Sequence, residues 1–112
     1  MTTHHMKLAR KPFESIKSGQ KIIETRLYDE KRQQLNIGDC IEFVQNDDPT
    51  RIVLTKVRAL YRYGSFNDLF SDFPPEYFGG VSKEELIGEI RKIYPKGEEQ
   101  KYGVVGIKIE LP

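Results

Sequence analysis

Two segments of alternating apolar residues constrain the fold of this chain more than any other feature of its sequence. The first covers residues 52–62, where one face would carry Val53, Thr55, Val57, Ala59 and Tyr61 and the other Ile52, Leu54, Lys56, Arg58 and Arg62. The second covers residues 102–111, with Val105, Ile107, Ile109 and Leu111 on one face. A period of two is typical of a strand that buries one face. We therefore expect a long strand over the first segment and a closing strand that pairs in the middle of the fold.

Further strands are predicted over residues 6–9, 21–28 and 40–45, where apolar and β-branched residues stand between turn signals. Three short helices are also expected. One surrounds Pro12–Ile16 and ends before a glycine, and two begin at capping boxes formed by Ser65 with Asp68 and by Ser82 with Glu85. Residues 96–101 are polar and are predicted to form a loop.

The order of these elements predicts the fold class. Most strands follow one another without a helical crossover, which favours an antiparallel sheet. We expect an α+β protein built on a small mixed, mostly antiparallel β-barrel, closed or partly open, with about three short helices packed on its outside. The 112 residues suit one domain. We expect that domain to span residues 6–112, after a disordered segment over residues 1–5.

Composition excludes several classes of function. The 18 basic and 17 acidic side chains leave a formal net charge of +1, so nucleic-acid binding would need a local basic patch. A single cysteine allows no intramolecular disulfide, and no apolar run approaches the length that spans a membrane. A cytoplasmic, monomeric protein without a cofactor is the expectation. The only histidines, His4 and His5, lie in the terminus expected to be disordered, so neither a metal site nor a histidine base is predicted.

A mixed-sign motif follows the first predicted helix. Lys21, Glu24 and Arg26 stand among isoleucines at the start of a strand. Glu24 and Arg26, two residues apart, would share a face with Tyr28, and Lys21 would join them only by lying just before the strand. The motif is then either an exposed ion pair contributing about 0–1 kcal/mol or a paired group that binds a ligand. A catalytic role would fall to Lys21 and nearby carboxylates.

A second candidate site lies on the long strand. Lys56, Arg58 and Arg62 would share one face, with Tyr61 and Tyr63 interleaved, a pattern that can hold phosphates and stack bases. A solvated sheet face is the alternative interpretation.

The run Gly19-Gln20-Lys21-Ile22-Ile23-Glu24-Thr25-Arg26 resembles the Gly-x-Lys-x-x-Glu-x-Arg signature of the ASCH domain family. The Leu35–Asp39 turn and the closing strand from Tyr102 to Ile107 are similar to that family as well. The resemblance implies a barrel similar to the PUA fold and a cleft, lined by the motif, that binds RNA, a nucleotide or a nucleoside through Lys21, Glu24, Arg26 and Tyr28.

The resemblance also implies two enzymatic alternatives. Small bacterial members include amidohydrolases that deacetylate N4-acetylcytidine with a lysine, a threonine and a glutamate. Lys21 matches the lysine, Glu24 stands at the threonine's place, Thr25 is one position further, and Glu76 is the nearest candidate for the glutamate. Other members are reported as ribonucleases. A metal-dependent activity of that kind would use the oxygens of Glu24, Asp29 and Glu30.

Overall fold

One five-stranded sheet organises the chain in the computed structural model, which describes residues 1–112. The elements in chain order are β1 (Thr3–Leu8), α1 (Arg10–Lys17), β2 (Ile23–Leu27), the 3-10 turn η1 (Arg32–Gln34), β3 (Cys40–Gln45), β4 (Asp48–Tyr63), α2 (Phe66–Ser71), the 3-10 turn η2 (Pro75–Phe78), α3 (Lys83–Ile93), α4 (Gly97–Tyr102) and β5 (Val104–Glu110). None of the helices combines the length and the apolar character that crossing a membrane requires.

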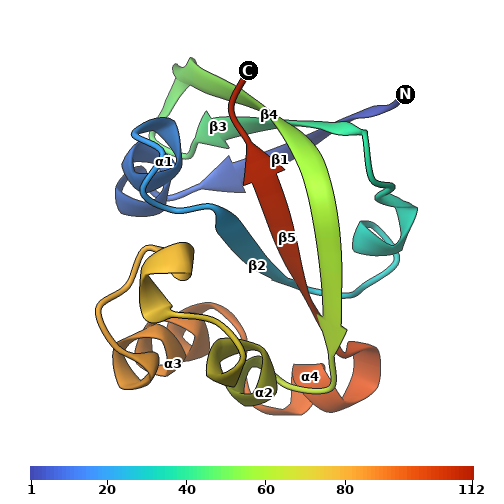
Figure 1. Cartoon of the computed structure of the whole chain (residues 1–112), viewed down its shortest axis with the longest axis vertical. Coiled ribbons are helices and arrows are strands. Elements are labelled where there is room, and N and C mark those ends of the chain that lie inside the picture. The colour runs from blue at the N-terminus through green and yellow to red at the C-terminus, as the bar shows by residue number, and fades with distance from the viewer.

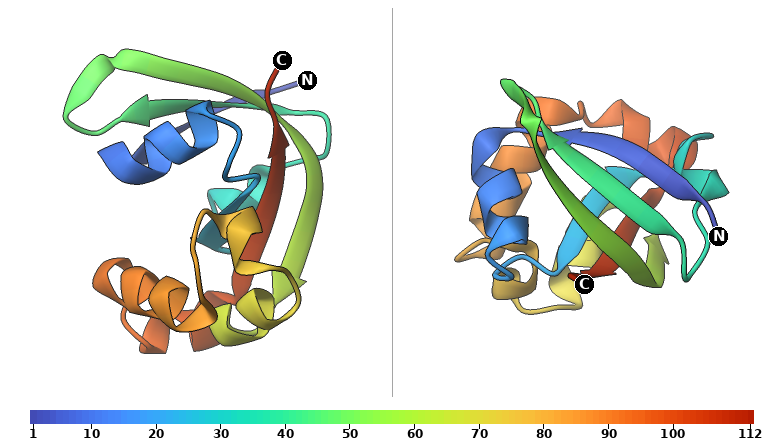
Figure 2. Two further views of the ribbon diagram at one scale, coloured as in Figure 1. Left: turned by 60° about the vertical axis from the view of Figure 1, so that its left-hand side comes forward. Right: turned by 90° about the horizontal axis from the view of Figure 1, so that it is seen from above.

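The strand order is β1-β3-β4-β5-β2. Only β1 and β3 run parallel, and the other three pairs are antiparallel, as the element order predicts. The closing strand β5 lies between β4 and β2, which confirms its expected central place. The sheet curls around the long, bent β4, but β1 and β2 remain its two edges and do not pair (Figures 1 and 2). The fold is therefore a half-barrel, so of the two expected forms the partly open one is found and the closed one is not.

The interior of the curled sheet holds the larger of two apolar clusters, which we call the barrel core. Its buried members come from four strands, from α1 and from the segment after η1: Met6, Leu8, Phe13, Ile16, Leu35, Ile41, Phe43, Val57, Val105, Ile107 and Ile109. Helix α1 contributes Phe13 and Ile16, which are three residues apart and so lie on one side of the helix. This helix fills the curl rather than packing outside it.

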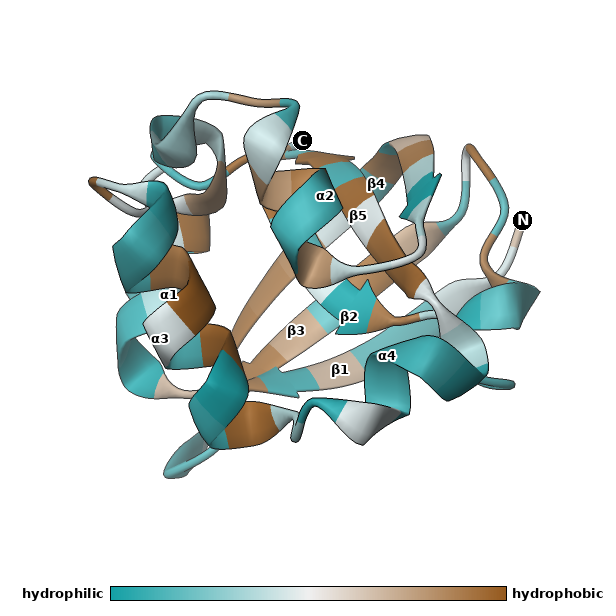
Figure 3. Cartoon of the chain, turned by 90° about the horizontal axis from the view of Figure 1, so that it is seen from below, coloured by the Kyte–Doolittle hydropathy of each residue, from teal (hydrophilic) through white to brown (hydrophobic).

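The second cluster, the aromatic core, lies on the opposite face of β2 and β5. It gathers Ile23, Leu27, Phe66, Leu69, Phe70, Phe78, Ile90 and Val104. Helices α2 and α3 and the turn η2 cover this face, and they group together at one end of the sheet (Figure 1). Seen from below, these helices turn mainly hydrophilic surface outward, while the strands behind them carry long hydrophobic stretches (Figure 3).

Both predicted serine N-caps form, without the reciprocal bond that would complete a capping box. The Ser65 hydroxyl accepts a hydrogen bond from the Asp68 amide at the start of α2, and Ser82 accepts one from Glu85 at the start of α3. The loop predicted over residues 96–101 is wrong, because α4 occupies it and raises the number of α-helices to four. One side chain of the polar helix α4 points inward. Glu99 is buried, where it accepts a hydrogen bond from the Phe66 amide at 2.7 Å.

The N-terminal strand begins at Thr3, so residues 3–5 lie in the sheet although the sequence predicts disorder there. Asp39 explains this order. Its carboxylate accepts a hydrogen bond from the Thr2 amide at 3.3 Å and lies 2.8 Å from Nε2 of His4. The buried Asp39 thus fixes the start of β1 against β3.

Candidate functional site

Lys21 lies in the short connection between α1 and β2. Gly19 ends the helix with φ of 84°, a value that favours glycine. The Lys21 amide then donates to the Ser15 carbonyl at 3.0 Å, and the Ile22 amide donates to the Tyr77 carbonyl in η2 at 2.9 Å. β2 begins only at Ile23. Lys21 therefore precedes the strand, the position from which it can join Glu24 and Arg26.

The three charged side chains form one ion bridge with Glu24 at its centre. Nζ of Lys21 lies 2.7 Å from Oε1 of Glu24, and Nε of Arg26 lies 2.7 Å from Oε2. Glu24 is 3% exposed, and the Lys21 and Arg26 side chains are only 11% and 13% exposed. The bridge is thus buried, so the interpretation of these residues as an exposed surface ion pair is wrong.

Burial and charge act in opposite directions on Glu24. Burial alone would raise the pKa of the carboxyl, but the Lys21 and Arg26 charges, with their hydrogen bonds, lower that pKa from 4.5 to about 2. For Arg26, burial would lower the pKa, and the adjacent Glu24 raises it above its ordinary value. The bridge accordingly holds an ionised carboxylate between positive groups at neutral pH.

Arg26 connects the bridge to the open side of the half-barrel. Its Nη2 donates to the Lys7 carbonyl at 2.9 Å, so one guanidinium links the edge strands β2 and β1. A pocket of about 420 Å³ lies at this place. It is lined by His5, Met6, Lys7, Arg26, Lys31, Arg32 and Val44, and we call it the basic pocket.

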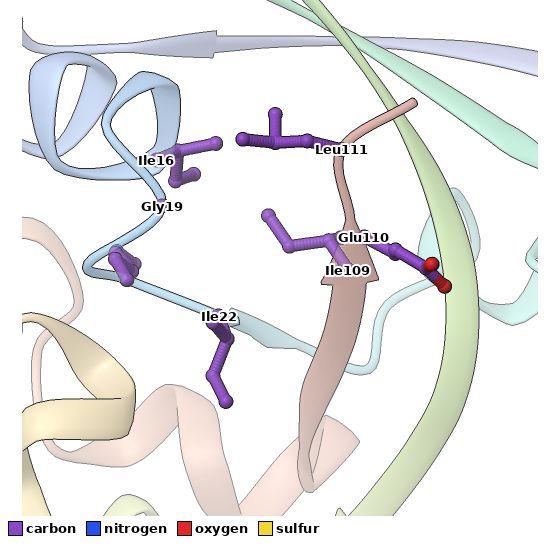
Figure 4. A pocket seen from close by; sticks show the side chains of 7 residues that line it. Ile16, Gly19, Ile22, Ile109, Glu110 and Leu111 are labelled. Atoms are coloured by element: carbon purple, nitrogen blue, oxygen red, sulfur yellow. The ribbon is translucent and has the colours of Figure 1, made fainter.

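Lys21 lines a different cavity, of about 310 Å³, at the far end of β5. Its apolar wall comes from Ile16, Ile22, Ile109 and Leu111. Figure 4 shows Ile16, Ile109 and Leu111 directed toward one another across this space, while the Glu110 carboxylate points away from it. We call this cavity the apolar pocket. Arg26 therefore lines the basic pocket, and Lys21 lines the apolar pocket.

Tyr28 lies on the same face of the chain as the bridge and packs against the barrel core. The guanidinium carbon of Arg62 lies 4.1 Å from the centre of its ring. One face of Tyr28 is thus covered by a cation, an arrangement that the sequence did not indicate.

A β-bulge in β4 divides the residues of the second predicted site between the two faces of the sheet. The register with β5 shifts between Val57 and Ala59, which reverses the alternation beyond that point. Arg62 consequently lies over Tyr28, whereas Lys56 is paired in register with Glu110 and Arg58 forms an exposed ion pair with Glu110. The prediction that the three basic residues share one face is wrong.

The two tyrosines of that patch belong to the other side of the sheet. Tyr61 and Tyr63 pack against the aromatic core, with the Tyr61 ring centre 4.8 Å from that of Phe73. Tyr63 donates a hydrogen bond to Asp72 at 2.6 Å. Neither ring lies beside the ion bridge, so Tyr61 is not placed to stack on a base bound there.

Of the residues of the enzymatic alternatives, only Lys21 and Glu24 are brought together. Thr25 alternates with Glu24 and Arg26 along β2 and so faces away from them. Glu76 is exposed in η2 and shares no hydrogen bond or ion pair with Lys21. Asp29 pairs with Arg32, and no group of three or more metal-binding side chains occurs in the structure. The set Glu24, Asp29 and Glu30 therefore does not form a cation site.

Sequence reasoning missed the wall of the basic pocket. His5 and Lys7 lie in β1, whose start was expected to be disordered, and Lys31 and Arg32 lie at η1 in a polar loop. The basic character that these residues share is the one sequence signal that could have indicated the pocket. The chain from residue 4 to residue 32 carries many basic side chains in an otherwise balanced protein, but no periodic pattern joins them.

Comparison with known proteins agrees with this architecture. The family model of the ASCH domain matches residues 6–112. The crystal structure of hypothetical protein PH0355 is 36% identical, with a TM-score of 0.86, and the match covers 99% of this chain and 100% of that one. The solution NMR structure of protein PF0455 from Pyrococcus furiosus is 38% identical, with a TM-score of 0.77, 98% of this chain and 97% of that chain being covered.

A more distant likeness concerns the fold alone. The crystal structure of ASCH from Zymomonas mobilis is 15% identical, with a TM-score of 0.70, over 97% of this chain and 67% of that chain. No curated protein matches the sequence.

Proposed function

The chain belongs to the ASCH domain family, which is associated with RNA binding, and from this premise we propose that it binds RNA or a nucleotide at the Lys21-Glu24-Arg26 bridge. The observation that carries the proposal is the burial of that bridge between two pockets. A buried ion bridge is costly to form unless each charge is paired, and it is weak evidence for stability alone. Its presence here supports a role in recognition.

Each member of the bridge has a distinct part in this proposal. Glu24 is buried and both of its oxygens are occupied, so it acts as a positioning residue that fixes the two cations. Arg26 keeps donors beyond those used by Glu24 and Lys7, and it lines the basic pocket, where it would bind a phosphate oxygen or a base edge. Lys21 would donate to the part of the ligand nearest the apolar pocket.

The same geometry favours binding over deacetylation of N4-acetylcytidine. A lysine attacks a carbonyl only as a free amine with its lone pair available, whereas Nζ of Lys21 is engaged by the Glu24 carboxylate at 2.7 Å. Glu24 itself has a pKa of about 2 and is a poor base at neutral pH. A catalytic reaction at Lys21 would require that a substrate first break this pair.

Fluorescence anisotropy with short single-stranded RNA oligonucleotides at several salt concentrations tests the proposal. We expect wild-type binding that weakens with salt, and a loss of about tenfold in Arg26→Gln, since one charge-assisted contact contributes about 1.5–3 kcal/mol. Lys11→Ala, which removes an exposed charge that lines neither pocket, is the matched control.

Two results would overturn the proposal. One is that the folded wild type binds neither RNA nor a nucleotide, and the other is equal affinity in Arg26→Gln and Lys11→Ala. Incubation with N4-acetylcytidine, followed by chromatography, belongs beside this titration. Turnover that disappears in Lys21→Ala would assign the hydrolase activity in place of simple binding.

A further inference from the structure

The basic pocket has a wall of one sign. Five of its seven lining residues, His5, Lys7, Arg26, Lys31 and Arg32, are basic and none is acidic. The chain as a whole has a formal net charge of only +1, so this concentration is local. A concave site lined by one sign of charge attracts ligands of the opposite sign.

Two of these side chains are held in place before any ligand arrives. Arg26 is fixed by the Glu24 carboxylate and by the Lys7 carbonyl, at 2.7 and 2.9 Å. Nη1 of Arg32 lies 3.4 Å from Oδ2 of Asp29, whose other oxygen accepts a hydrogen bond from the Arg32 backbone amide at 3.1 Å. Arginine forks that are already oriented lose little freedom when they bind a phosphate.

Three donors at this pocket lack a partner in the protein. Lys7 and Lys31 take part in none of the ion pairs of the structure. Nε of Arg32 is buried and has no hydrogen-bond partner. A buried donor without an acceptor is unusual in folded proteins and calls for an explanation. An anion bound in the pocket would supply an acceptor for the exposed Lys7 and Lys31 ammonium groups.

We propose that the basic pocket binds the phosphate group of the ligand, so that the protein selects phosphorylated nucleotides or RNA over free nucleosides. The inference deepens the proposed function and rests on it for the identity of the attached base. Lys7 and Lys31 neutralise the phosphate charge, and Arg26 and Arg32 orient its oxygens. Arg26 belongs to the ion bridge and also contacts the phosphate. It therefore sets the distance between the phosphate and the part of the ligand that binds at the bridge.

Isothermal titration calorimetry on the whole chain tests the phosphate site. The ligands are cytidine, cytidine 5′-monophosphate, inorganic phosphate, and a short RNA prepared with and without a 5′-phosphate. We expect the monophosphate to bind at least about tenfold more tightly than cytidine, and inorganic phosphate to compete with it. A 5′-phosphate that strengthens RNA binding would assign the pocket to a terminal phosphate, and an equal affinity of the two RNAs would assign it to the backbone.

Variants separate this site from the bridge. Lys31 is exposed, so Lys31→Ala leaves the packing intact. We expect it to weaken monophosphate binding about tenfold and to reduce the slope of log affinity against log salt by about one. Arg32→Lys keeps the charge but loses the fork, and we expect an intermediate loss. Lys11→Ala is again the control and should bind as the wild type does.

The outcomes are distinguishable from those of the RNA titration. Equal binding of cytidine and its monophosphate, or unchanged affinity in Lys31→Ala, would overturn the phosphate site even if RNA binds through the bridge. Monophosphate binding that depends on Lys31, without any RNA binding, would support the phosphate site and restrict the proposed function to nucleotides.

Discussion

The two faces of β2 show how one strand serves two purposes. Ile23 and Leu27 point into the aromatic core, where α2, η2 and α3 cover them. Glu24 and Arg26 alternate with them and form the buried ion bridge on the other face. The aromatic face is closed mainly by apolar contacts, with the buried Glu99 bonded to the Phe66 amide at its margin. The opposite face has charge in its interior and borders the open side of the half-barrel.

The difference teaches where stability and recognition are separated in this fold. Burial of apolar side chains stabilises a fold by about 25 cal/mol per Å², and that gain needs no ligand. Burial of an ion bridge roughly balances desolvation against attraction. We therefore expect changes on the aromatic face to lower stability at every pH, and changes on the bridge face to affect binding and a part of the stability that depends on pH.

Phe66→Ala should have the largest effect on folding. Phe66 is fully buried, and its ring stacks on those of Phe70 and Tyr94. We expect the free energy of unfolding to fall by about 3–5 kcal/mol, because the change removes apolar contact and leaves a cavity. Urea denaturation measures it. Tyr77→Ala, an exposed aromatic, is the control, and a loss at Phe66 no larger than at Tyr77 would refute the assignment of stability to this face.

Glu24→Gln should reveal the charge on the other face. It leaves Lys21 and Arg26 without a buried counter-charge, and we expect about 3 kcal/mol less stability at pH 7. The pKa of Glu24 is about 2 in the folded protein and 4.5 ordinarily. The stabilisation is therefore present above pH 4.5 and is lost as the pH falls toward 2.

Urea denaturation from pH 7 down to pH 2.5 tests this. The wild type and Glu24→Gln should converge in stability toward acid, whereas the exposed Glu89→Gln should follow the wild type throughout. Two curves that stay parallel from pH 7 to pH 2.5 would show that Glu24 does not titrate with folding.

Gly79→Ala should connect the two faces. Gly79 has φ of 81°, and an added Cβ would lie 2.9 Å from Oγ of Ser15 and 3.2 Å from Cβ of Lys21. We expect a loss of about 1–2 kcal/mol from the strained backbone and the contact, and weaker RNA binding because Lys21 shifts. Thermal unfolding and anisotropy measure the two. Gly88→Ala in α3, where the space is open, should not destabilise. If Gly79→Ala and Gly88→Ala have equal stability and equal RNA affinity, η2 does not position Lys21.

Arg62→Ala should have the smallest effect of the four. Its stacking on Tyr28 contributes about 0.5–1 kcal/mol at an exposed position. Chemical denaturation resolves a change of this size, and the Tyr28 ring signals in an NMR spectrum should shift as the cation leaves. Arg58→Ala, which removes an exposed ion pair with Glu110, should leave both unchanged. Tyr28 ring signals that do not change in Arg62→Ala would show that Arg62 does not stack on Tyr28.

Local chemistry made much of the fold predictable. The hydroxyl of Ser82 caps α3 as its sequence indicates, and the apolar face of β5 places that strand between two others. The bridge was predictable as well, since Glu24 and Arg26 are two residues apart on one strand and Lys21 needed only to precede it. For the cap and the bridge the deciding contact lies within a few residues of the pattern that predicts it, and for β5 the apolar face of the strand indicates a central place without naming its partners.

The missed features depend on contacts between distant segments. The bulge after Val57 shifts the register of β4 against β5, and no local signal in the alternating sequence marks that point. Helix α4 is held by Glu99 reaching the Phe66 amide, 33 residues away in the chain. The basic pocket joins Lys7 to Lys31 across the gap between the edge strands. The periodicity of one segment contains no information about contacts with segments far away in the sequence.

The Arg26 hydrogen bond to the Lys7 carbonyl has a consequence for how copies of this protein meet one another. Strands at the edge of a sheet expose unpaired amides and carbonyls that can recruit a strand from another molecule, and positive side chains along them oppose such self-association. Arg26 occupies one of these carbonyls, and Lys7 places a further charge along β1. We expect Lys7→Ala to scatter more light than the wild type in concentrated, low-salt solution. The cations that suit a ligand would then also keep the protein free of aggregation.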